Sequence, residues 1–186
     1  MRTLRILVLT AVTLATLSCN RAGGPANTTV ANKELSPEAQ QIANERPEVS
    51  QTTLENDEIA IDQTWPVISD KLQLKGFSED EAREATLASW RDLRLNYLEP
   101  QEPLTPGILD SYATELGKLV INSTPSEADV EIDGQAFNRK TNTAAWLQPG
   151  TYKVKVGKSG FVPTEKSATV RQGEKTEIDF TLRQGQ

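Results

Sequence analysis

The chain has 186 residues, a formal net charge of −6, 5% aromatic residues, no histidine and a single cysteine. The negative charge argues against a nucleic-acid partner, because phosphate groups repel an acidic protein. The missing histidine removes the most common general base and metal ligand, and one cysteine excludes a disulfide within the chain. The length predicts two small domains, and with so few aromatic side chains each core is expected to be small.

Residues 1–19 are typical of an export signal, with two arginines before an apolar stretch at 6–17 that is too short and threonine-rich for a membrane span. Cys19, directly after this stretch, resembles the acylated cysteine of bacterial lipoproteins, although Leu17 stands where that family has a smaller residue. The resemblance implies cleavage before Cys19 and attachment of fatty-acyl groups to it. The protein would then be exported to the cell envelope and held at a membrane surface, on the outer membrane or the periplasmic side. Ordinary secretion, or a signal segment retained as an anchor, is the alternative.

The composition of residues 20–63 predicts a flexible acidic linker that contains one short helix. They hold eight acidic and three basic residues, and the first part is rich in Asn, Gly and Thr. Ser36-Pro37-Glu38 is typical of a helix start, with Ser as the cap and Pro at the first helical position. This helix is expected to end before Pro47. The acidic segment 48–62 is expected to be further linker.

The apolar periodicity and the cap and stop residues in 64–116 predict a small domain of three helices, at 65–75, 79–97 and 106–116. Thr64, Ser78 and Thr105 are suitable caps, and Gly76 and Gly117 are suitable stops. The predicted inward stripe of the second helix consists of Ala82, Ala85, Ser89, Leu93 and Tyr97, with Trp90 beside them. Trp65, Trp90 and Tyr112 lie on apolar stripes, and we expect core positions for them rather than a ligand platform.

The same segment faintly resembles a three-helix peptidoglycan-binding domain. The resemblance rests on Leu72-Gln-Leu-Lys-Gly76-Phe77, on Trp90 and on Leu104-Thr-Pro-Gly-Ile-Leu109. The central Asp-Gly-x-x-Gly loop of that family is replaced by Ser78–Glu81. No binding residue is therefore assigned from it.

Residues 117–183 predict an all-β sandwich. Apolar and charged residues alternate in Val130-Glu-Ile132, Tyr152-Lys-Val-Lys-Val156 and Ile178-Asp-Phe-Thr-Leu182, as expected of strands with one buried face. Asp133-Gly134 favours a tight hairpin, and Pro149-Gly150 favours a turn. The predicted fold class is thus α+β in separate domains, with the helices first.

Residues 118–182 resemble a PEGA domain. The resemblance rests on Lys118–Gly134, which ends in Ala-Asp-Val-Glu-Ile-Asp-Gly, on Leu147-Gln-Pro-Gly-Thr-Tyr152 and on Gly160-Phe161. The sequence departs from the family at Pro125-Ser-Glu-Ala128, which lacks the glycine of the Pro-Glu-Gly-Ala motif. The resemblance implies an accessory β-sandwich of envelope proteins, with a binding or spacer role and no catalytic residues.

Carboxylates are the only candidate ligands for a metal ion. They form two groups. The first lies at a predicted helix start and consists of Glu79, Asp80, Glu81 and Glu84. The second lies along a predicted strand and consists of Asp129, Glu131 and Asp133. Acids favour a helix start in any case, and a solvated strand face explains the second group. The sequence contains no phosphate-binding glycine loop, nucleophile elbow or Ser/His pair. We therefore predict a protein that is not an enzyme and uses no cofactor, metal or small-molecule substrate.

Two functions remain open. The first is a non-enzymatic envelope lipoprotein, anchored through Cys19, that presents the β-sandwich as a binding or scaffolding module to another envelope protein. The second is a secreted or anchored protein that binds peptidoglycan or another cell-wall glycan through the three-helix domain. No nucleic-acid partner is expected for either.

Overall fold

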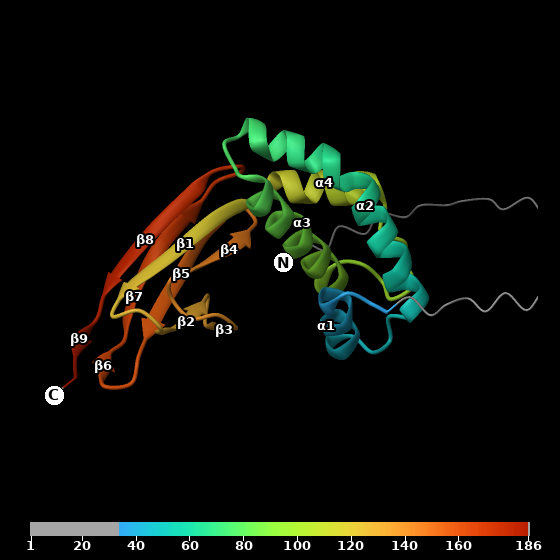
Figure 1. Cartoon of the computed structure of the whole chain (residues 1–186). Helices are drawn as coiled ribbons and strands as arrows, with labels where there is room; N and C mark the ends of the chain where they lie inside the picture. Colours follow the sequence, from blue (N-terminus) through green and yellow to red (C-terminus); the bar gives the residue numbers. More distant parts are fainter. Residues whose placement is uncertain (1–33, 186) are drawn as a thin grey trace, which may run out of the picture. The chain divides into compact units, whose positions relative to one another are not determined.

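The computed structural model describes residues 34–185, in which four helices precede nine strands (Figure 1). These residues belong to one compact unit of the chain. The predicted export signal, Cys19 and the first part of the predicted linker lie outside the described residues. Of the helices described, none has the length and apolar character needed to cross a membrane.

The helices begin at polar caps, because the first backbone N–H groups of a helix have no partner within it. Their bounds are α1 Pro37–Glu45, α2 Gln51–Leu74, α3 Glu79–Asn96 and α4 Pro106–Glu115. In each case a side-chain oxygen accepts a hydrogen bond from a backbone N–H of the first turn; the capping residues are Ser36, Ser50, Ser78 and Thr105. The predicted short helix at Ser36-Pro37-Glu38 is confirmed.

Two predictions about the helical part are wrong. The domain contains four helices rather than three, because α1, predicted as a helix within the linker, packs into the same core; and residues 51–62 are helix rather than linker. The acidic composition and the expected cap at Thr64 predicted a helix start at residue 65, but α2 runs through both Thr64 and Pro66. The Thr64 hydroxyl donates a hydrogen bond to the backbone carbonyl of Ala60 within the helix. Leu54, Ile68 and Leu72 of this helix are completely buried. Their burial outweighs the one backbone hydrogen bond that proline removes, because helices in proteins are stabilised mainly by their packing.

The helical core is built from apolar side chains of all four helices. Its largest completely buried members are Ile42, Leu54, Ile68, Leu72, Trp90 and Leu109. The core position predicted for Trp90 is confirmed, whereas Trp65 and Tyr112 are only partly buried against this core. Tyr97, predicted on the inward stripe, is the C-terminal cap of α3 and is 63% exposed. The helix has ended there, so the 3.6-residue periodicity no longer applies.

The strands form two main sheets and a short pair. One sheet has the order β4-β1-β8, from Thr143–Leu147, Gly117–Thr124 and Lys175–Thr181. The other has the order β3-β2-β5-β7, from Gln135–Phe137, Asp129–Ile132, Gly150–Gly157 and Thr164–Val170. The short strands β6 (Phe161–Val162) and β9 (Arg183–Gln184) pair with each other. The prediction of a β-rich part after the helices is confirmed.

Both main sheets contribute to one hydrophobic core. Leu119 and Ile121 of β1, Val154 and Val156 of β5 and Phe180 of β8 are buried together. The intervening residues of these strands point away from the core, as the alternation in the sequence predicts. Asp133 and Gly134 have positive φ angles and join β2 to β3 as the predicted tight hairpin.

Gly117 joins the two parts of the fold without a loop. Helix α4 ends at Glu115 and β1 starts at Gly117. A Cβ atom at this position would lie 2.2 Å from the carbonyl oxygen of Arg171 and 2.6 Å from Cγ1 of Val170. Glycine is therefore required here by the close approach of another backbone segment, in addition to the helix stop that the sequence suggested.

Candidate functional site

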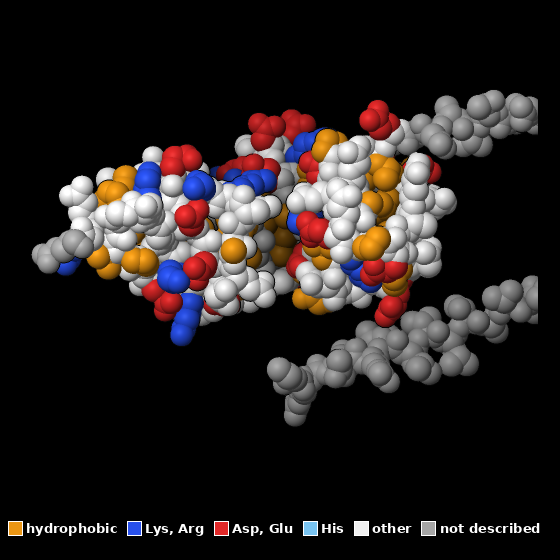
Figure 2. All heavy atoms as spheres, turned by 90° about the horizontal axis from the view of Figure 1, so that it is seen from below, with side chains coloured by type: hydrophobic (Ala, Val, Ile, Leu, Met, Phe, Trp, Pro, Cys, Tyr) orange, Lys and Arg blue, Asp and Glu red, His pale blue; other side chains and the backbone are white. Residues whose placement is uncertain are grey.

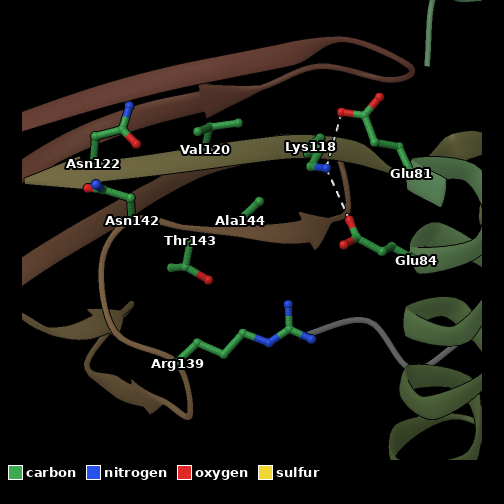
Figure 3. Close-up of a pocket in the computed structure, with 9 residues that line it drawn as sticks. All are labelled: Glu81, Glu84, Lys118, Val120, Asn122, Arg139, Asn142, Thr143 and Ala144. Carbon is green, nitrogen blue, oxygen red and sulfur yellow. Dashed lines mark hydrogen bonds and ion pairs between the residues drawn. The ribbon is translucent and has the colours of Figure 1, made fainter. Parts of the chain in front are cut away.

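The start of α3 contacts the β4-β1-β8 sheet through two lysines. The ammonium group of Lys118, on β1, lies 3.2 Å from Oε1 of Glu81 and 3.0 Å from Oε2 of Glu84. The ammonium group of Lys175, on β8, lies 2.8 Å from the same oxygen of Glu81. Figure 3 shows Lys118 reaching from the sheet towards both acids on α3. Glu81 is thus held between two cations from neighbouring strands.

Two aromatic rings lie beside these ion pairs. Phe77 packs against Trp146, with ring centroids 5.0 Å apart and planes inclined by 53°. The ammonium group of Lys118 lies 5.5 Å from the centroid of Trp146, and that of Lys175 lies 5.4 Å from the centroid of Phe77. Each lysine therefore contacts both a carboxylate and an aromatic face, which stabilises a partly desolvated cation.

Glu81 also forms the capping box at the start of α3. Its carboxylate accepts a hydrogen bond from the backbone N–H of Ser78, and the Ser78 side chain accepts one from the backbone N–H of Glu81. Burial raises the pKa of Glu81, but the bonds from Lys175, Ser78 and Lys118 outweigh burial and lower the pKa to about 2. Glu81 is therefore ionised at neutral pH and links the helix cap to the sheet.

A groove of about 390 Å³ opens next to these contacts (Figure 3). Val120 and Asn122 of β1 and Thr143 and Ala144 of β4 line it from the sheet. Arg139 extends into it from the loop before β4, and Glu81 and Glu84 border it on the α3 side. The groove combines a small apolar floor with amide, hydroxyl and charged groups, which suits a polar ligand or an extended peptide better than a large apolar molecule.

The space-filling view shows one face of this region. In Figure 2, hydrophobic side chains are visible in the recess between the β-rich part and the helical part, with acidic and basic side chains around it. Most hydrophobic side chains of the described residues lie in the two cores instead. This recess is therefore a place where apolar groups remain accessible.

A second candidate region lies where α3 ends and faces α4. The ring centroids of Tyr97 and Tyr112 are 5.8 Å apart, and the Tyr112 hydroxyl donates a hydrogen bond to Asp92. Burial, followed by the bond to Asp92, raises the pKa of Tyr112. Burial and the nearby Asp133 also raise the pKa of Tyr152. A shallow pocket of about 360 Å³ adjoins Tyr112 and Ile108 on α4.

The carboxylates singled out from the sequence do not come together as a metal site. Glu81 and Glu84 are occupied by Lys118, while Asp129 lies 3.2 Å from Lys140 and Glu131 lies 3.1 Å from Lys155. Asp133 accepts a hydrogen bond from the backbone N–H of Lys153. Within residues 34–185, no group of three or more potential ligands is suitably placed for a metal ion. The lipidation predicted at Cys19 concerns a residue outside the described part.

Sequence reasoning missed a buried ion pair in the helical core. Nε and Nη2 of Arg94, on α3, each lie 2.5 Å from a carboxylate oxygen of Asp57, on α2. The indole N–H of Trp90 donates a third bond to Asp57, at 2.8 Å. The pair was missed because 48–62 was assigned to a linker. The spacing of Leu54, Ile61, Ile68 and Leu72 after Ser50 was the signal that could have revealed the helix.

Comparison with known proteins supports one of the three suggested resemblances. Residues 116–186 match the model of the PEGA domain family. A search of curated proteins finds no match for the chain. The matched residues begin one position before β1 and cover every strand of both main sheets. Residues 116–186 of this chain are therefore a PEGA domain, preceded by a four-helix region.

Proposed function

We propose that this chain is a non-enzymatic envelope lipoprotein whose helical part and PEGA domain act together as one binding or scaffolding module. The anchor is inferred from the apolar stretch at 6–17 and from Cys19, the chain's single cysteine, directly after it. Acyl chains on Cys19 would hold the protein at the membrane, since each buried methylene group contributes about 0.8 kcal/mol. The segment after Cys19 would let the module reach partners in the envelope.

The observation that carries the binding role is the fixed contact between α3 and the PEGA sheet. Lys118 is only 8% exposed, and its ammonium group lies against the carboxylates of Glu81 and Glu84 and against the Trp146 ring. Desolvated ion pairs with defined partners favour one arrangement of the groups that they join. A surface composed of both parts can therefore be presented in a constant geometry, as a binding module requires.

The contacts of the buried ionisable groups also support a non-catalytic role. The most deeply buried charges, Asp57 and Arg94, neutralise each other in a structural pair. The carboxylate with the strongly lowered pKa, Glu81, serves a helix cap and two lysines. Catalytic acids and bases usually have a pKa close to the working pH. The pKa of Glu81 lies far below neutral pH instead, so this carboxylate keeps a fixed charge, which suits a structural role.

The anchor is tested by expressing the full chain in a bacterial host with a radioactive or clickable fatty acid. We expect the wild-type chain to acquire the label and to sediment with membranes, and globomycin to block its maturation. Cys19→Ser should lose the label and leave the membrane fraction, whereas Ser18→Ala, which keeps a small residue before the cysteine, should behave like wild type. A Cys19→Ser chain that stays on the membrane would count against lipidation.

Binding of cell-wall glycan through the helical part is the second proposal. The exposed ring of Tyr97, next to Tyr112 and the carboxylate of Asp92, favours it. An aromatic face beside hydrogen-bonding groups can stack on a sugar ring and bind its hydroxyls.

Glycan binding is tested by retention on purified peptidoglycan. The full chain should be retained, and Tyr97→Ala should reduce retention. Val162→Ala, a change at an exposed hydrophobic position in β6, is the control. No retention of the wild-type chain removes this alternative.

A further inference from the structure

The strand edges of the PEGA domain are unequally protected. Among the described strands, β4 and β8 are the edges of one main sheet, and β3 and β7 are the edges of the other. Strands β7 and β8 carry several charged side chains, and β3 has three residues. Charges and short length are features by which proteins prevent an edge from pairing with another chain. Strand β4, with the sequence Thr-Ala-Ala-Trp-Leu, has no charge and no proline.

The outer side of β4 has no strand partner. Its five residues pair with Gly117–Ile121 of β1 on one side. On the other side, no backbone hydrogen bond to the residues of β4 occurs within the described chain. The backbone N–H and C=O groups that point away from β1 therefore have no backbone partner among residues 34–185. An extended partner of four or five residues would match the length of β4, which is about 16 Å.

The groove beside β4 supplies charges of both signs at defined places. Arg139 lies at its loop end, and no acidic side chain pairs with it anywhere in residues 34–185. Glu84 lies on the opposite side, and its side chain remains 51% exposed although it contacts Lys118. Figure 3 shows Arg139 extending below β4 into the space in front of α3. Arg139 is an exposed cation with no acidic partner among residues 34–185, so it can form an ion pair with an acidic group of a ligand at this strand edge.

We propose that β4 accepts an extended segment of a partner protein, which adds one strand to the β4-β1-β8 sheet and places an acidic side chain on Arg139. Backbone hydrogen bonds to β4 would supply affinity, and Arg139 would select the acid and fix the register. The proposal deepens the proposed function by naming the kind of partner that the module binds. It does not depend on the lipid anchor.

The test is a selection of randomised seven-residue peptides, displayed on phage, against the full chain purified in detergent. We expect enriched sequences of alternating pattern that share an Asp or Glu at one position. For a synthetic copy of an enriched peptide, Arg139→Gln should weaken binding about tenfold, the equivalent of one charge-assisted hydrogen bond. Lys140→Gln is the matched control, because this neighbouring exposed cation is paired with Asp129. Its binding should stay at the wild-type level.

Backbone pairing has its own readout in the same peptide. N-methylation at alternate residues, those facing β4, should abolish binding, whereas N-methylation at the residues between them should leave it unchanged. Ala144→Lys, which puts a charge on the edge at a half-buried groove position, should also abolish binding. Circular dichroism of each variant must show a folded chain. Peptides that bind equally with either methylation pattern, or no enrichment over the Ala144→Lys variant, would overturn the proposal.

Two further outcomes separate the alternatives. If sedimentation shows a wild-type dimer that Ala144→Lys converts to a monomer, the edge belongs to a second copy of this chain and the proposed partner is wrong. The Cys19→Ser chain should bind the selected peptide as wild type does. Failure of the anchor therefore leaves strand pairing intact, and failure of strand pairing leaves the acyl label on Cys19 intact.

Discussion

Asp57 on α2 and Arg94 on α3 form a two-point ion pair in which both side chains are almost completely buried. Arg94 also donates a hydrogen bond to the backbone carbonyl of Glu99, and Arg46 donates one to the backbone carbonyl of Arg94. The pair therefore connects the first three helices and the segment after α3. Replacement of one partner leaves the other charge buried without a counter-ion, and this strongly lowers the free energy of unfolding.

We predict that Asp57→Ala lowers the free energy of unfolding by about 3–5 kcal/mol, as for other broken buried pairs. Urea unfolding followed by circular dichroism measures the change. Asp62→Ala, at an exposed acid on the same helix, is the control and should stay within about 0.5 kcal/mol of wild type. A similar small effect of both variants would show that the pair has little importance for stability.

Glu81 should make stability depend on acid pH. Its pKa is about 2 in the folded protein and about 4.5 when unperturbed, so the unfolded state binds the proton first as the pH falls. The resulting stabilisation is complete above pH 4.5 and is lost as the pH falls towards 2. The pKa difference corresponds to about 3 kcal/mol at most.

The measurement is urea unfolding at several pH values between 7 and 2. Glu81→Gln should be less stable than wild type at pH 7, and the difference should shrink towards pH 2. Glu79→Gln changes an exposed acid in the same helical turn and should retain the pH profile of wild type. If Glu81→Gln also retains that profile, the two lysines do not hold the carboxylate ionised.

Gly117→Ala should destabilise the junction between α4 and β1. The added methyl group would overlap the carbonyl oxygen of Arg171, which is backbone and cannot rotate away. Overpacking of this kind typically lowers the free energy of unfolding by about 1–3 kcal/mol. Thermal unfolding measures the loss. Gly107→Ala, at a helical position with no atom within 4 Å of the new Cβ, is the control and should not destabilise the protein.

Tyr112 should make the fold sensitive to alkaline pH. Burial and the bond to Asp92 raise its pKa above the unperturbed value of 10.0, so the folded state retains a proton that the unfolded state releases. The contribution is complete below pH 10 and decreases as the pH rises further. Tyr112→Phe should therefore weaken this alkaline decrease in the free energy of unfolding. Tyr97→Phe keeps Tyr112 and should leave the decrease unchanged.

The sequence by itself determined the local and periodic features of this protein. Alternation in Val154-Lys155-Val156, the caps at Ser36, Ser78 and Thr105, and the Asp133-Gly134 hairpin depend on neighbouring residues, and they were predicted correctly. The ordered motifs from Lys118 to Phe161 also identified the PEGA domain, which the family comparison confirms.

Only the tertiary structure decided which groups the acidic residues of α2 and α3 contact. Helix α2 was misread because burial of Leu54 and the Asp57–Arg94 pair, both long-range contacts, stabilise a segment whose composition suggests a linker. Glu81 contacts lysines that lie 37 and 94 positions further along the chain, on strands that are neighbours in the sheet. The groove between Arg139 and Glu84 likewise exists only after α3 docks on the sheet. Contacts between distant residues depend on folding of the whole unit, and local sequence patterns do not encode them.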